Sequence, residues 1–219
     1  MNTLTQSIDI YCERTDASFW SEPFNAITNL AFIIGALFLI HLYRATGRKD
    51  WQAICLIVIV CAVGIGSFLF HTVATRWALL ADVIPITIFI FFYLWVALRR
   101  LVGLKGWQTG ACLAVFFAIS QLTDSIPREY SFNGSITYFP SLAALIIIGS
   151  ILKHKAHPLA TQFFLAFGIF AASLTFRSID MMMCPILWVG THFLWHCLNG
   201  LLLYILTRVI IQTPPKQVI

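Results

Sequence analysis

Residues 51–72 read WQAICLIVIVCAVGIGSFLFHT, an apolar stretch that contains no Asp, Glu, Lys or Arg. A helix of roughly 20 apolar residues is long enough to cross the hydrocarbon core of a bilayer. Further stretches of similar character lie at residues 22–43, 79–98, 106–122, 137–152, 159–176 and 187–209. The sequence therefore predicts an all-α integral membrane protein, folded as a bundle of seven transmembrane helices.

The composition agrees with a membrane protein. Apolar residues make up 59% of the 219 residues and charged residues 11%, whereas soluble proteins average about 45–50% and about 25%. The net charge of +5 comes from basic residues between apolar stretches, which does not indicate a nucleic-acid partner. We expect residues 1–219 to form one membrane-embedded domain, with a polar N-terminal segment at residues 1–21.

The basic residues predict the orientation in the membrane. With seven crossings the two termini lie on opposite sides, and one side holds only Arg14, Arg76, Arg128 and Arg177 of the 14 basic residues. The other ten share the opposite side: Arg44, Arg48, Lys49, Arg99, Arg100, Lys105, Lys153, Lys155, Arg208 and Lys216. Because cytoplasmic loops carry an excess of Lys and Arg, we expect a cytoplasmic C-terminus and an N-terminus outside.

Polar side chains interrupt three of the apolar stretches at one predicted depth. Ser67 and His71 are four residues apart and therefore share one face of a helix. Asp82 lies near the start of the next stretch, and His192 and His196 form a second pair with the same spacing. Titratable groups inside a bilayer are costly, and those retained are usually functional. We therefore expect these groups to meet at the outer ends of their helices.

Three histidines indicate a zinc site. His192 and His196 can bind from one helix face and His71 from across the bundle, which leaves the fourth position open, as in catalytic zinc sites. A hard cation such as magnesium would require carboxylates instead. Zinc lowers the pKa of a bound water to near 7. Asp82 would then act as general base and acid, and Ser67 would donate to the developing oxyanion or fix a ligand.

Each of these features also has a purely structural interpretation. A single pair of histidines four residues apart often arises by chance. Asp82 could cap a helix or pair with Arg76, and Ser67 could be a small residue that allows close helix packing. Convergence from three separate segments is what favours a zinc-dependent hydrolase.

Together these residues resemble the S-x-x-x-H, D, H-x-x-x-H pattern of the alkaline ceramidases and of the wider CREST superfamily of seven-helix membrane hydrolases. Residues 66–71 read GSFLFH, Asp82 follows, and residues 192–196 read HFLWH. The YCE at residues 11–13 and the EPFNAITNL at residues 22–30 are similar to the N-terminal signature of the ceramidases. The similarity covers nearly the whole chain.

The resemblance implies a zinc ion held by His71, His192 and His196, with Asp82 as acid/base and Ser67 stabilising the oxyanion. It implies hydrolysis of ceramide-like N-acyl sphingolipids to a sphingoid base and a free fatty acid. Another acyl lipid (an N-acyl amide or a lysolipid ester) or a role as an adiponectin-receptor-like receptor remain alternatives. The short loops and compact length look bacterial, so we expect a bacterial inner membrane with the site toward the periplasm.

The family also has a calcium site in its N-terminal segment, which braces the helices near the zinc. Calcium takes six to eight oxygen ligands. Glu13 and Glu22 match family positions, whereas Ile10 and Thr15 stand where the family has an aspartate and an asparagine. The candidate calcium ligands are Asp9, Tyr11 (through its carbonyl), Glu13, Asp16 and Glu22. The alternative is a solvated acidic segment.

Two of the six cysteines lie in predicted outer segments. An oxidising compartment permits a disulfide between Cys12 and Cys184, and the ceramidase resemblance supports the Cys12 end. This bond would tie the N-terminal segment to the loop before the last helix. The others fall within apolar stretches, where cysteine behaves as a small apolar residue: Cys55, Cys61, Cys112 and Cys197.

Overall fold

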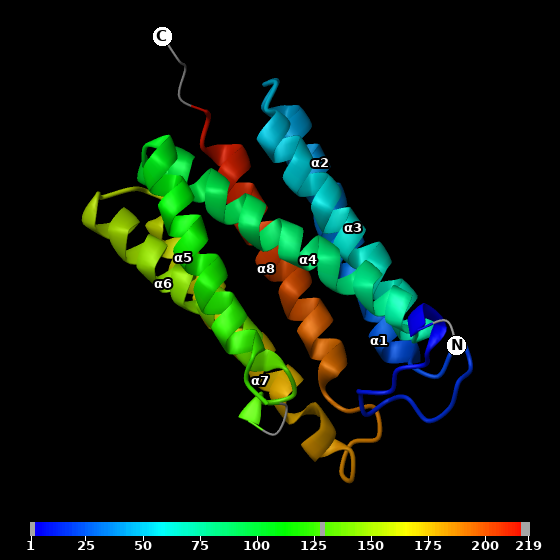
Figure 1. Ribbon diagram of the computed structural model, residues 1–219. Helices are drawn as coiled ribbons and strands as arrows, with labels where there is room; N and C mark the ends of the chain where they lie inside the picture. Colours follow the sequence, from blue (N-terminus) through cyan, green and yellow to red (C-terminus); the bar gives the residue numbers. More distant parts are fainter. Residues whose placement is uncertain (1–2, 128–129, 216–219) are drawn as a thin grey trace.

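The computed structural model describes residues 3–127 and 130–215. Arg128 and Lys216, two of the bases that predict the orientation, lie outside the described residues. The described chain is a bundle of helices without named strands (Figure 1). Its helices are α1 (Pro23–Thr28), α2 (Leu30–Ala45), α3 (Trp51–Val73), α4 (Arg76–Ala97) with the π-helical turn η2 (Leu98–Val102), α5 (Gly106–Asp124), α6 (Phe139–His154), α7 (Ala160–Met183) and α8 (His192–Gln212). Short 3-10 turns lie at η1 (Thr3–Thr5) and η4 (Ser135–Tyr138).

Six helical stretches of the described chain are long and apolar enough to cross a membrane, which fits a multi-pass integral membrane protein. They are Pro23–Ala45, Trp51–Val73, Arg76–Val102, Ser135–His154, Ala160–Met183 and His192–Gln212. The helix α5 has 19 residues but is not among these six stretches. The predicted seventh crossing, and with it the orientation of the termini, therefore stays a prediction.

Several helices differ from the bounds of the predicted segments, and the first and sixth segments differ in an informative way. The first segment is divided at Asn29 into the short α1 and the longer α2. The helix α7 continues to Met183, seven residues beyond the predicted end at residue 176, and so includes Asp180. The charges of Arg177 and Asp180 ended the predicted apolar stretch, but both side chains find partners inside the fold.

Two helices approach each other closely beside the candidate site. A side-chain carbon at Gly66 of α3 would overlap the Ala81 carbonyl group of α4. Small residues allow such contact between the backbones of membrane helices. Because Ser67 follows Gly66 and Asp82 follows Ala81, this crossing brings Ser67 and Asp82 side by side.

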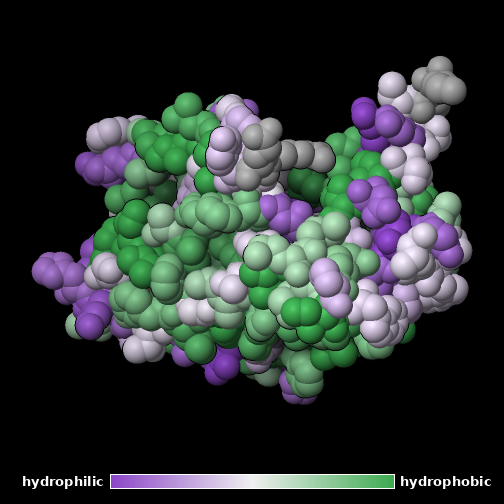
Figure 2. All heavy atoms as spheres, turned by 90° about the horizontal axis from the view of Figure 1, so that it is seen from below, coloured by the Kyte–Doolittle hydropathy of each residue, from purple (hydrophilic) through white to green (hydrophobic). Residues whose placement is uncertain are grey.

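The N-terminal segment folds over one end of the bundle. The Ile8 N–H donates to the Ala74 carbonyl oxygen at 2.8 Å, and the Arg76 N–H donates to the Gln6 carbonyl oxygen at 3.1 Å. A disulfide joins Cys12 to Cys184, with 5.5 Å between the Cα atoms, so the predicted pairing is confirmed. Figure 1 shows this segment and the loop between α7 and α8 at the same end. Viewed from that end, apolar side chains cover much of the surface and hydrophilic ones gather in separate groups (Figure 2).

Candidate metal centre

The three predicted histidines meet at this end of the bundle. His71 comes from the last turn of α3, and His192 and His196 from the first turns of α8. One ligand atom from each lies within 4.8 Å of the other two. All three side chains are fully buried, with exposures of 0–1%. The group could therefore hold a metal ion, as the sequence predicts.

Glu22 orients His71. The Glu22 Oε2 atom lies 2.6 Å from Nδ1 of His71. Burial raises the pKa of Glu22, but the His71 imidazole and the Arg14 guanidinium outweigh burial and hold this pKa below its usual value. Glu22 is therefore a carboxylate that accepts the Nδ1 proton, which leaves Nε2 of His71 with a free lone pair.

Thr28 orients His196 in the same way. The Thr28 hydroxyl lies 3.0 Å from Nδ1 of His196 and donates to the Phe24 carbonyl oxygen at 2.7 Å. A hydroxyl group has only one proton to donate. The Thr28 oxygen must therefore accept the Nδ1 proton of His196, which leaves Nε2 of His196 free.

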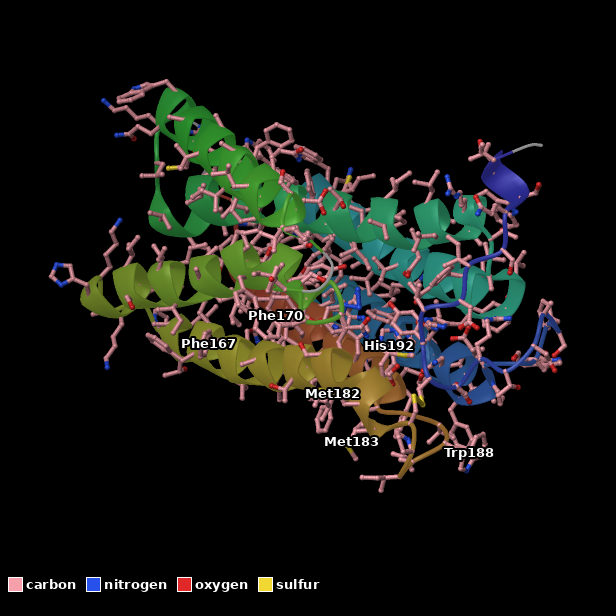
Figure 3. All side chains as sticks on the ribbon, turned by 60° about the horizontal axis from the view of Figure 1, so that its bottom comes forward. Phe167, Phe170, Met182, Met183, Trp188 and His192 are labelled. Carbon is pink, nitrogen blue, oxygen red and sulfur yellow. A yellow bond between two sulfur atoms is a disulfide. The ribbon has the colours of Figure 1, made fainter. Side chains whose placement is uncertain are left out.

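Asp180 and Tyr11 hold His192. The fully buried Asp180 carboxylate accepts the N–H groups of Thr191 and His192, at 2.7 and 2.9 Å, from the start of α8. Its second oxygen accepts the Cys12 N–H at 3.0 Å. The Tyr11 ring stacks on the His192 ring, with 3.6 Å between centroids. Figure 3 shows His192 toward the interior of the bundle, whereas Met182, Met183 and Trp188 lie at its edge.

These contacts leave three buried imidazole nitrogens without a hydrogen-bond partner: Nε2 of His71, Nδ1 of His192 and Nε2 of His196. A buried polar atom without a partner is costly and calls for an explanation. Neutral imidazole nitrogens are common metal ligands. The donor set therefore fits a metal ion of the kind that three histidines bind.

Asp82 and Ser67 lie next to this group but are not part of it. Asp82 is buried, with 9% exposure, and faces His71 and Ser67. Its Oδ1 atom has no hydrogen-bond partner. Within the described chain, the carboxylate does not belong to the group that could hold a metal ion, so its oxygen is available for another contact.

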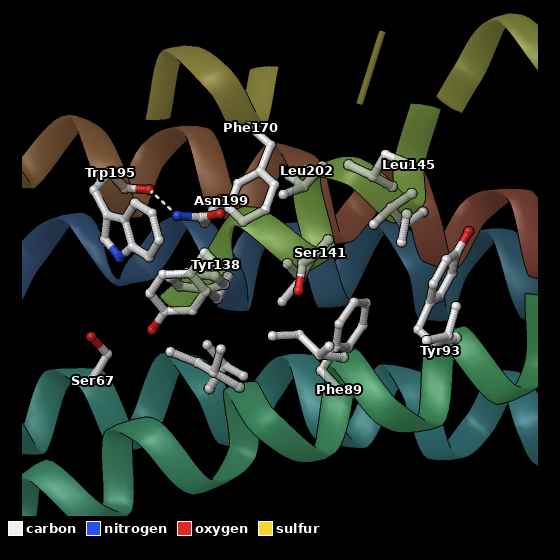
Figure 4. A pocket seen from close by; sticks show the side chains of 18 of the residues that line it. Ser67, Phe89, Tyr93, Tyr138, Ser141, Leu145, Phe170, Trp195, Asn199 and Leu202 are labelled. Atoms are coloured by element: carbon white, nitrogen blue, oxygen red, sulfur yellow. Dashed lines mark hydrogen bonds between the residues drawn. The ribbon is translucent and has the colours of Figure 1, made fainter. Parts of the chain in front are cut away.

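A long cavity begins at this polar end and runs between the helices (Figure 4). It contains about 850 Å³ of space, part of which is open to the outside. Ser67, Asp82 and His196 line the polar end, and Tyr93 lies at the opposite end of the view in Figure 4. The walls between them are mostly apolar: Phe32, Val63, Ile86, Phe89, Ile90, Leu94, Phe116, Leu145, Ile148, Phe170, Leu202, Leu203 and Leu206.

Arg177 stacks behind the polar end of the cavity. Its guanidinium carbon lies 5.4 Å from the Trp195 ring and 5.8 Å from the rings of Tyr11 and Tyr138. Stacking of a guanidinium on aromatic faces is favourable. Because Trp195 and Tyr138 line the cavity, Arg177 helps to fix the position of two of its walls.

In the described chain, the calcium candidates are not gathered in one acidic cluster. Asp9 and Asp16 are exposed. The Glu13 carboxylate accepts the N–H groups of Phe24 and Asn25, at 2.7 and 2.8 Å. Glu22 pairs with Arg14 and His71. No acidic group of the described chain forms a cluster of three or more metal-binding side chains, so calcium stays an untested prediction.

The sequence does not predict a supporting role for four residues that contact the site: Arg14, Thr28, Arg177 and Asp180. Three of them act on side chains that are remote in sequence, so spacing gives no signal. Asp180 did carry one, because it is an acid between apolar neighbours, Ile179 and Met181. Acids retained in such surroundings usually have a buried partner.

The fold and the site define a multi-pass membrane protein with a buried histidine group that could hold a metal beside an apolar cavity. Residues 5–214 match the ceramidase family. Since the match covers nearly the whole chain, the protein belongs to the ceramidase family, which confirms the resemblance seen in the sequence. Membership supports a hydrolase that acts on ceramide in general. No curated protein matches the chain.

Proposed function

We propose that the protein hydrolyses the amide bond of ceramide-like N-acyl sphingolipids, with zinc held by His71, His192 and His196. One observation carries the proposal: three unpartnered imidazole nitrogens lie beside an unpartnered carboxylate oxygen of Asp82, at the polar end of an apolar cavity. A purely structural metal would not require Asp82 or the cavity, which favours the enzyme over a receptor of the same fold.

The length of the cavity supports a lipid substrate. Its lining extends from Asp82 to Leu94 on α4 and from Trp195 to Leu206 on α8. At 1.5 Å per residue, these separations correspond to about 16–18 Å. One leaflet of a bilayer has a hydrocarbon thickness of about 15 Å, half of the full core. The cavity therefore suits one acyl chain, with the amide group beside Asp82.

The residues of the chain divide the chemistry between them. When bound, zinc would act as a Lewis acid on the carbonyl oxygen and would lower the pKa of water. Asp82 accepts a proton from water as the water oxygen attacks the amide carbonyl carbon. Ser67 donates a hydrogen bond to the oxyanion that develops. Asp82 then returns the proton to the amide nitrogen as the C–N bond breaks, which gives a fatty acid and a sphingoid base.

We further propose that the site faces the periplasm of a bacterial inner membrane. The excess of Lys and Arg on the side of the C-terminus supports this orientation. A green fluorescent protein fused to the C-terminus should fluoresce, because it folds in the cytoplasm, and an alkaline phosphatase fused there should be inactive. The opposite pair of results would reverse the orientation.

The test of the function is mass spectrometry of the products from a panel of ceramides, other N-acyl amides and lysolipid esters. The detergent-purified chain is used as prepared, after zinc removal and after zinc is restored. We expect fatty acid release from ceramides that is lost and recovered with zinc. His196→Ala should abolish it, whereas His154→Ala, a change at an exposed histidine, should not.

Each other outcome has a meaning. Release only from another acyl lipid would keep the hydrolase and replace ceramide as the substrate. Folded, zinc-loaded protein that releases nothing from any lipid would refute the hydrolase proposal. Release that continues without zinc would refute the role of the histidine group.

A further inference from the structure

The side chain of Arg14 links the N-terminal segment to two other parts of the fold. It is buried, with 7% exposure. Its guanidinium donates to Oε1 of Glu22 at 2.5 Å, to the Asp16 carbonyl oxygen at 3.0 Å and to the His71 carbonyl oxygen at 3.1 Å. One cation thus joins the N-terminal segment, the residue that precedes α1 and the last turn of α3.

The oxygens around Arg14 leave little room to coordinate a second cation. A calcium ion on Glu22 would lie about 2.3–2.6 Å from the carboxylate oxygen, yet Nε of Arg14 already lies 2.5 Å from Oε1. The other oxygen accepts from His71 at 2.6 Å and from Asn25 at 3.1 Å. Like charges this close repel strongly where water is scarce. Arg14 and calcium therefore compete for the same carboxylate.

Glu13 does not supply an alternative. Its two oxygens accept the first N–H groups of α1, those of Phe24 and Asn25. Burial raises the pKa of Glu13, and these two N–H groups oppose that rise. Ile10 and Thr15 stand where the family has acidic and amide ligands, and their side chains offer no carboxylate or amide oxygen.

We propose that the guanidinium of Arg14 is the fixed cation of the N-terminal segment and braces Glu22 and His71 without calcium. The brace reaches the metal centre in one step, because Glu22 holds Nδ1 of His71. Arg14 is therefore a positioning residue for His71, and this chain departs from the calcium site that the family resemblance implies.

The test measures melting and zinc affinity, so its result does not depend on which lipid is hydrolysed. The full chain in detergent is stripped of metals, reloaded with one equivalent of zinc and melted while the fluorescence of its seven tryptophans is followed. Calcium chloride is titrated in, with magnesium chloride as the control for ionic strength. We expect no change in the melting temperature with either salt. A rise produced by calcium alone would overturn the proposal.

Variants test the brace itself. Arg14→Gln leaves a buried carboxylate without its cation, and loss of one partner from a buried pair typically lowers the melting temperature of a chain this size by about 6–20 °C. It should also weaken zinc binding by about 10–100-fold in competition with a chelator. Arg14→Lys, which keeps the charge but not the three-way fork of donors, should recover part of both.

The matched control is Arg76→Gln, at an exposed arginine of the same end of the bundle, which should behave as the unchanged protein does. If Arg14→Gln melts together with Arg76→Gln, the brace does not exist. If Arg14→Gln melts early but binds zinc as tightly as the unchanged protein, the positioning role is refuted.

Discussion

The helices α8 and α5 have similar lengths but opposite surroundings. In α8, 67% of the 18-residue apolar stretch that could cross the membrane is buried inside the fold. The polar residues His192, His196 and Asn199 are among the buried residues of this helix. In α5, within the described chain, Thr109 is the only buried residue, and Gln121 and Asp124 are exposed. Burial therefore separates the polar residues that build the site from those that face outward, although their residue types alone do not.

The largest expected effect compares a buried acid with an exposed one. Asp82→Asn removes the group proposed to accept and return the proton, and should lower ceramide turnover by about 10²–10⁴-fold. Because Asp82 is not part of the histidine group, the zinc content of the Asp82→Asn protein should equal that of the unchanged protein. Asp124→Asn on α5 should keep full turnover. Initial rates and metal analysis of both variants decide this, and full activity in Asp82→Asn would eliminate the acid/base role.

A smaller effect is expected from a hydroxyl that only orients a ligand. Thr28→Val preserves shape but removes the acceptor for Nδ1 of His196, and should weaken zinc binding by about 10–100-fold. Thr123→Val on α5 removes a hydroxyl that donates to the Ser120 carbonyl oxygen of its own helix and should leave zinc binding unchanged. Competition with a chelator measures both. Equal affinities would mean that Thr28 does not set the orientation of His196.

The smallest effect concerns packing. Gly66→Ala places a methyl group against the Ala81 carbonyl, and such overpacking typically costs about 1–3 kcal/mol. Gly110→Ala on α5 meets nothing within 4 Å and should not destabilise the fold. Melting curves of the two variants provide the measurement. A Gly66→Ala variant as stable as Gly110→Ala would show that α3 and α4 can separate without cost.

The sequence predicts the helices well because apolar length is a local property. The stretch predicted at residues 51–72 forms α3 at Trp51–Val73. Prediction fails where a charge is buried, since hydropathy ends a segment at a charge whether or not the fold supplies a partner. Arg177 and Asp180 have such partners, so α7 continues past the predicted end at residue 176. The break at Asn29 is likewise not predicted, because Asn29 lies inside the single apolar stretch expected at residues 22–43.

For the site, the sequence predicts the residues that would touch a metal or substrate but not those that hold them. His71 and His196 stand out against an apolar background, whereas Thr28 is unremarkable until α1 packs beside α8. From the sequence alone, Arg14 is only one of the bases that predict the orientation in the membrane. Its contacts with Glu22 and His71 depend on the fold of residues 11–22 over the end of α3, which no local pattern encodes.

The most direct test of the central claim is the zinc content of the purified chain, measured per mole of protein by inductively coupled plasma mass spectrometry. We predict about one zinc ion in the unchanged protein and in His41→Ala, which alters an exposed histidine of α2, and none in His71→Ala. A zinc content that is zero throughout, or that is the same in His71→Ala as in the unchanged protein, would contradict the account.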